Sequence, residues 1–107
     1  MVNYQTEPID GVLAAIADPA RRSIVRRLAE GPASVSQLAA PLTMSRPGVM
    51  KHVRVLEQAG LLEHRKEGRT RWCELRPEPL AAVDDWLARY RGFWEGQLDS
   101  LVEHFSS

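Results

Sequence analysis

One stretch of the chain, VSQLAAPLTMSRPGVMKHVRVLEQAGLL, constrains the fold more than any other. A short helical pattern, VSQLAA, is followed by the four-residue turn PLTM and by a longer helical pattern that ends near Ala59. Ser34 and Ser45 stand where helix N-caps are needed, and Gly60 stands where a helix commonly ends. Two short helices about such a turn predict a helix-turn-helix at about residues 35–59.

Two further helices are predicted ahead of this stretch. The first ends near Ala17, because apolar residues recur on one of its faces: Ile9, Val12, Leu13 and Ile16. Asp18 is a good N-cap and Pro19 suits a first helical position, so a second helix is expected from there to about Ala29.

The pattern changes after Gly60. Residues 61–75 alternate in the manner of two strands about a Glu67-Gly68 turn, which predicts a β-hairpin. A last helix is expected at about residues 79–105. The predicted fold is therefore mainly α with a small β-hairpin, in the order α-α-α-α-β-β-α, which is that of a winged helix-turn-helix. A length of 107 residues predicts a single domain over residues 1–107.

Charge is unevenly distributed along the chain, although the net charge is zero. Residues 18–76 carry twelve Lys or Arg against six Asp or Glu, while residues 1–17 are acidic and residues 77–107 have two Arg against six acids. A basic middle between acidic ends is typical of a chain in which only one part meets a polyanion.

The longer helix of the helix-turn-helix has two distinct faces. Val49, Val53 and Leu56 recur with helical spacing and must face the core, which turns the cations Arg46, Lys51 and Arg54 outward. Arginine and lysine on an exposed helix can pair with guanine in the major groove of DNA. The helix N-terminus offers N–H donors to a phosphate, beside the hydroxyls of Thr43 and Ser45.

The hairpin is basic as well. Four cations surround its glycine turn: Arg65, Lys66, Arg69 and Arg71. They repel one another, and a phosphate backbone or a minor groove would relieve that repulsion. A helix-turn-helix followed directly by a basic wing, at about residues 61–75, predicts binding to double-stranded DNA.

The runs ADPARRSIVRRLAEG, SVSQLA and SRPGVMKHVRVLEQAGLLEHRKEGRTRWCEL resemble the ArsR/SmtB family of repressors, and the last helix resembles that of a metal-independent branch. The resemblance covers nearly the whole chain. It implies a homodimeric repressor in which the first and last helices form the interface. It places Arg46, Pro47, Gly48 and Lys51 on the base-reading surface and Thr43, Ser45 and Arg54 beside phosphates.

The sequence departs from the metal-sensing members of that family. No Cys-x-Cys occurs in the helix before the longer helix of the helix-turn-helix, where arsenic and cadmium sensors have one. In the last helix, Asp84 is followed two residues later by Trp86, where zinc sensors have a histidine. His52, His64 and His104 are too far apart in sequence for one helix to present them to one ion. We therefore expect no metal site. A metal-responsive repressor with an atypical site, or a winged-helix protein-interaction module, are the alternatives.

The last helix carries an apolar stripe that the rest of the chain is too small to cover. The stripe is interrupted throughout by charges, which argues against a membrane, so a second copy of the chain is the expected partner. The predicted interface is formed by Val12, Leu13, Ile16, Leu87, Tyr90, Trp94, Leu98 and Leu101. Gly92 and Gly96 would permit close approach or mark a bend. Two-fold symmetry predicts an inverted-repeat operator.

The remaining features carry less information. The single cysteine, Cys73, fits a reducing compartment, and its alternation with Leu75 predicts a buried thiol. The chain has no signal-peptide pattern at its start and no apolar run of about 18 residues, so a cytoplasmic protein is expected. No catalytic or phosphate-loop motif occurs, so we expect neither an enzyme nor a cofactor, and nothing in the sequence specifies a small-molecule or protein effector.

Overall fold

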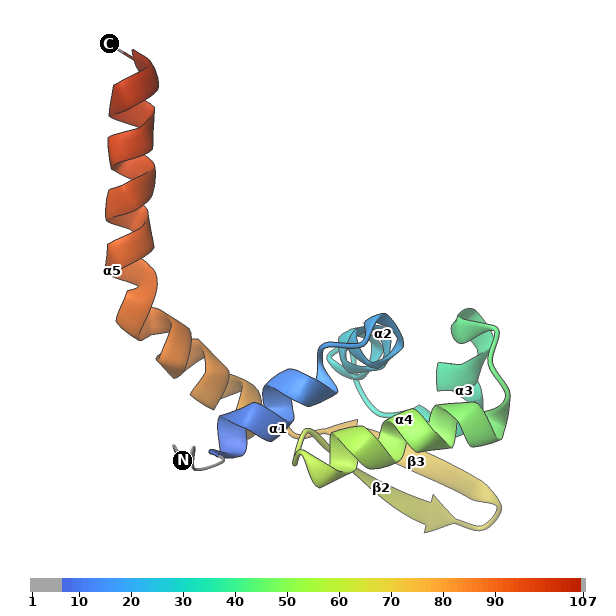
Figure 1. Ribbon diagram of the computed structural model, residues 1–107. Coiled ribbons are helices and arrows are strands. Elements are labelled where there is room, and N and C mark those ends of the chain that lie inside the picture. Colours follow the sequence, from blue (N-terminus) through green and yellow to red (C-terminus); the bar gives the residue numbers. More distant parts are fainter. Residues whose placement is uncertain (1–6, 107) are drawn as a thin grey trace, which may run out of the picture.

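The computed structural model describes residues 7–106 (Figure 1). Residues 1–6, on which part of the signal-peptide prediction rests, lie outside this range. The elements in chain order are α1 (Pro8–Ala15), α2 (Pro19–Leu28), β1 (Ala33–Ser34), α3 (Val35–Ala39), a 3-10 helix η1 (Ala40–Leu42), α4 (Arg46–Gln58), β2 (Leu62–Glu67), β3 (Thr70–Leu75) and α5 (Glu78–Ser106). The predicted order of helices and hairpin is confirmed, with β1 and η1 in addition.

Side-chain caps begin the helices at the predicted places. The Asp18 carboxylate accepts hydrogen bonds from the backbone N–H groups of Ala20, at 2.8 Å, and Arg21, at 3.2 Å. Ser34 forms a capping box with Gln37, and Ser45 accepts from the Gly48 N–H at 3.2 Å. Each cap satisfies N–H donors that the first turn of a helix cannot pair.

The sheet has one more strand than the sequence predicts. Its order is β1-β3-β2, with both pairings antiparallel, and Ala33 of β1 lies opposite Cys73 of β3. A two-residue strand has no periodicity from which to predict it. Part of the predicted turn is also more regular than expected, because it belongs to the 3-10 helix η1. Thr43, which follows η1, has a φ of 51°, in the left-handed region.

The core lies between the helices and the inner face of the sheet. Val49, Val53 and Leu56 of α4 are 0% exposed, which confirms the predicted inner face of that helix. Val12 of α1 belongs to this core at 3% exposure, so its predicted place on a dimer surface is wrong, because its own chain already covers it. Leu13 is exposed and Ile16 is partly buried against the core.

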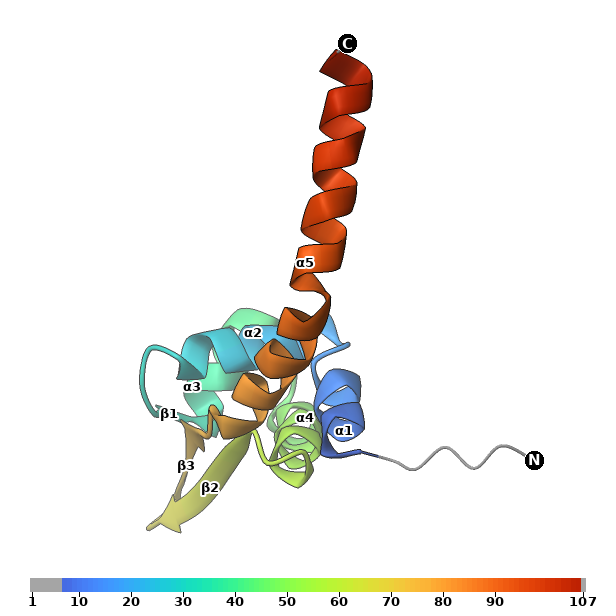
Figure 2. The same ribbon diagram turned by 90° about the vertical axis from the view of Figure 1, so that its left-hand side faces the viewer.

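Helix α5 starts on the body of the molecule and then leaves it. Leu80 and Val83 pack against the core next to α1, whereas every residue from 84 to 105 is exposed. Figures 1 and 2 show the helix bending part-way and projecting from the body. Among the described residues, no helix combines the length and the apolarity needed to cross a membrane.

Candidate nucleic-acid interface

The outward face of α4 presents the residues predicted to contact DNA. Arg46, Pro47, Lys51 and Arg54 are all exposed, on the face opposite Val49, Val53 and Leu56. Gly48 is half-buried, and a Cβ placed there would stand 3.3 Å from the Ser45 hydroxyl. Gly48 therefore leaves room for the helix cap.

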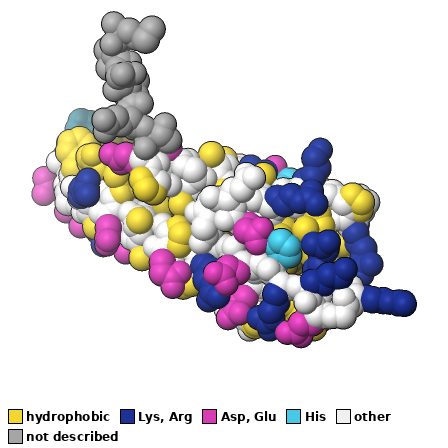
Figure 3. Space-filling model, turned by 90° about the horizontal axis from the view of Figure 1, so that it is seen from below, with side chains coloured by type: hydrophobic (Ala, Val, Ile, Leu, Met, Phe, Trp, Pro, Cys, Tyr) yellow, Lys and Arg dark blue, Asp and Glu magenta, His cyan; other side chains and the backbone are white. Residues whose placement is uncertain are grey.

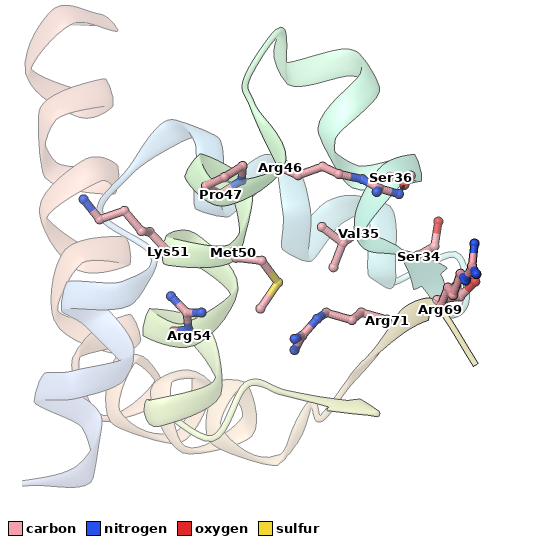
Figure 4. A pocket seen from close by; sticks show the side chains of 11 residues that line it. Ser34, Val35, Ser36, Arg46, Pro47, Met50, Lys51, Arg54, Arg69 and Arg71 are labelled. Carbon is pink, nitrogen blue, oxygen red and sulfur yellow. Dashed lines mark hydrogen bonds between the residues drawn. The ribbon is translucent and has the colours of Figure 1, made fainter. Parts of the chain in front are cut away.

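A groove with a volume of about 660 Å³ separates this face from the wing formed by β2, β3 and their turn. Its walls come from the start of α3, from α4 and from the wing, as Figure 4 shows. Five side chains lining it are cationic: Arg46, Lys51, Arg54, Arg69 and Arg71. None of the described residues that line it is acidic. A concave surface with one sign of charge concentrates the field toward a ligand of the opposite sign.

Figure 3 shows the same asymmetry over one whole face. Lys and Arg side chains gather at one end of that face, whereas Asp and Glu side chains are spread over the rest. The structure therefore brings together cations of α4 and of the wing, of which Arg46 and Arg71 are 25 residues apart in the sequence.

A hydrogen bond joins the start of α4 to α3. The Arg46 guanidinium donates to the hydroxyl of Ser36, so this side chain must exchange that partner to reach a base edge. Thr43 Oγ1 donates to the Leu42 carbonyl at 2.7 Å, within the turn. Both Thr43 and Ser45 are exposed beside the N-terminus of α4.

The wing has two faces, which the sequence prediction treated as one basic cluster. Alternation along the strands puts Lys66 and Arg71 on the face of buried Cys73, and Arg65 on the other. Arg65 pairs with Glu67, at 2.9 Å, and with Glu74, at 3.5 Å. These carboxylates raise the pKa of Arg65, mainly through the hydrogen bond to Glu67. The prediction that the four wing cations repel one another is therefore wrong for Arg65, because two carboxylates of the wing neutralise it.

The double arginine at the start of α2 has a role that sequence reasoning missed. Arg21 Nε donates to the Ala15 carbonyl at 2.5 Å, and Arg22 Nη1 donates to the Ile16 carbonyl at 2.9 Å. These two side chains therefore satisfy carbonyls at the end of α1. Arg21 Nη1 also lies 3.3 Å from Nδ1 of His52 on α4.

Comparison with known proteins places the chain in a family. Residues 16–65 match a family described as a helix-turn-helix domain. The HTH-type transcriptional regulator Rv2034 of Mycobacterium tuberculosis is 41% identical over 98 residues, covering 92% of this chain and 89% of that protein. A crystal structure of the ArsR family transcriptional regulator RHA00566 is 44% identical, with a TM-score of 0.78, and covers 89% of this chain and 97% of its own. The chain belongs to the ArsR family of winged helix-turn-helix transcriptional regulators.

The transcriptional repressor SdpR of Bacillus subtilis is a more distant relative, 26% identical over 82 residues that cover 77% of this chain and 91% of that protein. These relatives are transcriptional regulators, a class of protein without enzymatic activity. The family resemblance stated from the sequence is thereby confirmed, as is the prediction that the chain is not an enzyme.

The side chains that could bind a metal in this ArsR-family chain are dispersed. Within residues 7–106, no three His, Cys, Asp or Glu side chains are gathered closely enough to hold an ion. Burial, together with the nearby Glu57 carboxylate, raises the pKa of the Cys73 thiol to about 11. The thiol is therefore protonated at neutral pH, and a protonated buried thiol is a poor nucleophile and a poor metal ligand.

Proposed function

We propose that this ArsR-family regulator binds double-stranded DNA through the groove between α4 and the wing. The observation that carries the proposal is the groove itself, in which the exposed face of α4 and two wing arginines present five cations, with no acid among the described residues that line it. A recognition helix in the major groove would read bases with Arg46 and Lys51. The wing arginines would neutralise phosphates alongside it.

We further propose that two copies of the chain bind an inverted-repeat operator. The projecting part of α5 exposes large apolar side chains: Trp86, Leu87, Tyr90, Phe93, Trp94, Leu98, Leu101, Val102 and Phe105. So much apolar surface on one helix needs a partner, and the same helix of a second chain supplies a matching one. Exposed Leu13 of α1 and half-buried Ile16, which follows α1, would border this interface. A two-fold axis would set the recognition helices one DNA turn apart, about 34 Å.

The proposed outcome of binding is repression without a metal signal. The name of the relative SdpR, a transcriptional repressor, supports repression. The dispersed donor groups and the protonated Cys73 support a regulator that does not sense metal. In this proposal the winged helix-turn-helix and the dimerisation helix form one domain.

In vitro selection of DNA by the purified full chain tests the proposal. We expect enrichment of one inverted repeat, bound with an affinity that falls as salt rises. Arg46→Ala and Lys51→Ala should each lose about 1–3 kcal/mol of specific binding, as expected for a lost base contact. Arg26→Ala removes an exposed cation of α2 that does not line the groove, and it is the matched control. Unchanged affinity of Arg46→Ala and Lys51→Ala for operator and random DNA would contradict the proposed recognition surface.

A further inference from the structure

The end of α4 that lies farthest from Arg46 is joined to the wing by a chain of hydrogen bonds. Glu57 Oε2 accepts from the backbone N–H of His64, at 3.1 Å, and lies 2.7 Å from the ring Nδ1 of the same residue. His64 Nε2 is in turn 3.4 Å from Nη1 of Arg71. The three residues come from α4, β2 and β3, and Arg71 alone of the three lines the groove.

The chemistry of the three groups determines which atom donates in each of these hydrogen bonds. An ionised carboxylate can only accept, so Nδ1–H of His64 is the donor in the hydrogen bond to Glu57. In the neutral imidazole with its proton on Nδ1, Nε2 is the acceptor for a guanidinium N–H of Arg71. Histidine in this form connects a carboxylate on one side to an arginine on the other.

The same contacts fasten the wing to the helix. β2 is an edge strand, because β3 lies between it and β1, and an edge strand leaves backbone N–H groups without a partner strand. Glu57 accepts one of these N–H groups and so ties the edge of the wing to α4. The side chains of His64 and Glu57 are only 23% and 35% exposed, so they are packed between the two elements.

We propose that Glu57 and His64 are positioning residues that hold the wing against α4 and aim Arg71 into the groove. Figure 4 shows Arg71 reaching from the wing toward α4, on the side of Met50 and Arg54. An arginine that is already held in place loses less side-chain freedom when it meets a phosphate. The inference rests on the proposed DNA binding, since Glu57 and His64 would act on DNA through the wing that they hold, and chiefly through Arg71.

The direction in which one substitution changes the DNA affinity distinguishes this role from a simple charge effect. Glu57→Ala removes a negative charge close to the groove, and charge alone would make binding to a polyanion tighter. Loss of positioning predicts the opposite, an operator affinity about fivefold to tenfold weaker. Glu63→Ala is the matched control, because it removes the same charge one residue before His64 in a side chain that pairs with Arg76. Glu63→Ala should leave the affinity unchanged or raise it.

A double-mutant cycle on the full-length protein tests the path through Arg71. Operator affinity is measured by fluorescence anisotropy for the wild type, Glu57→Ala, Arg71→Ala and the double variant, at temperatures where circular dichroism shows each to be folded. We expect the two effects to be clearly less than additive, because in the Arg71→Ala variant Glu57 no longer has Arg71 to position. Glu57→Gln keeps the size of the side chain and one acceptor oxygen, so it should recover part of the affinity and serves in place of an unstable Glu57→Ala.

Two results would overturn the inference. One is a Glu57→Ala variant that binds as Glu63→Ala does, and the other is an effect of Glu57→Ala that adds in full to that of Arg71→Ala. Both are distinguishable from failure of the proposed function, in which Arg46→Ala and Lys51→Ala leave the wild-type affinity for DNA unchanged.

Discussion

Replacing Trp94 by glutamate tests the proposed dimer most directly. Trp94 is 39% exposed, which leaves roughly 60–100 Å² of a large aromatic side chain for a second copy to cover. At about 25 cal/mol per Å², this burial contributes about 1.5–2.5 kcal/mol per chain. A two-fold interface contains the residue twice, so the dimer loses about 3–5 kcal/mol, and its Kd rises by at least about 100-fold. Burial of the new carboxylate adds to the loss.

Sedimentation equilibrium measures the association of the two copies. We expect a dimeric wild type at micromolar concentration and a monomeric Trp94→Glu variant with weak binding to an inverted repeat. Ala88→Glu is the control, because it adds the same charge at an exposed position about 100° around α5 from Leu87, on the side of Asp84. It should remain dimeric. A wild type that is monomeric at micromolar concentration and still binds an inverted repeat tightly would refute the reasoning.

Three further predictions concern the wing, the effector and the start of α2. Arg69→Ala should weaken binding to all DNA sequences alike and lower the slope of log K against log salt by about one, and an unchanged slope in titrations at several salt concentrations would remove Arg69 from the phosphate contacts. Micromolar Zn(II), Cd(II) or As(III) should not release the protein from its selected operator, and release abolished by Cys73→Ser or His104→Ala would revive a metal-sensing function. Asp18→Ala should lower the melting temperature at pH 7, and the difference should shrink below about pH 3.8. Hydrogen bonds from backbone N–H groups, first that of Arg21, lower the pKa of Asp18 in the folded state. The ionised carboxylate therefore stabilises the folded protein above the pKa of Asp18 in the unfolded chain, and this stabilisation is lost as pH falls through its pKa in the folded protein. A difference in melting temperature that is the same at pH 7 and below about pH 3.8 would show that the charge of Asp18 does not stabilise the cap.

Much of the helical framework could be predicted because short-range chemistry determines it. Asp18, Ser34 and Ser45 cap helices with their own side chains, and the acceptor oxygen is at most three residues from the N–H groups that it binds. The inner face of α4 was equally predictable, because helical spacing alone puts Val49, Val53 and Leu56 on one side.

Contacts between distant segments were the ones missed. Strand β1 exists because Ala33 meets Cys73, forty residues later, and two residues carry no signal of their own. The capping of α1 by Arg21 and the pairing of Arg65 with Glu74 likewise depend on how the elements approach one another. The sequence predicts a solvent-exposed side chain for a charged residue whether or not a partner lies beside it in the folded protein.

The sequence by itself determined the order of the elements, the limits of most helices, the family resemblance and the cationic face of α4. It could do so because caps, helical periodicity and turn residues act over a few positions. Only the tertiary structure decided that Val12 is covered by its own chain and that Arg65 faces away from Arg71. It also decided that Glu57, His64 and Arg71 meet. The physical reason is that burial and hydrogen bonding between elements depend on packing geometry, which emerges only when the helices and the sheet close around one core.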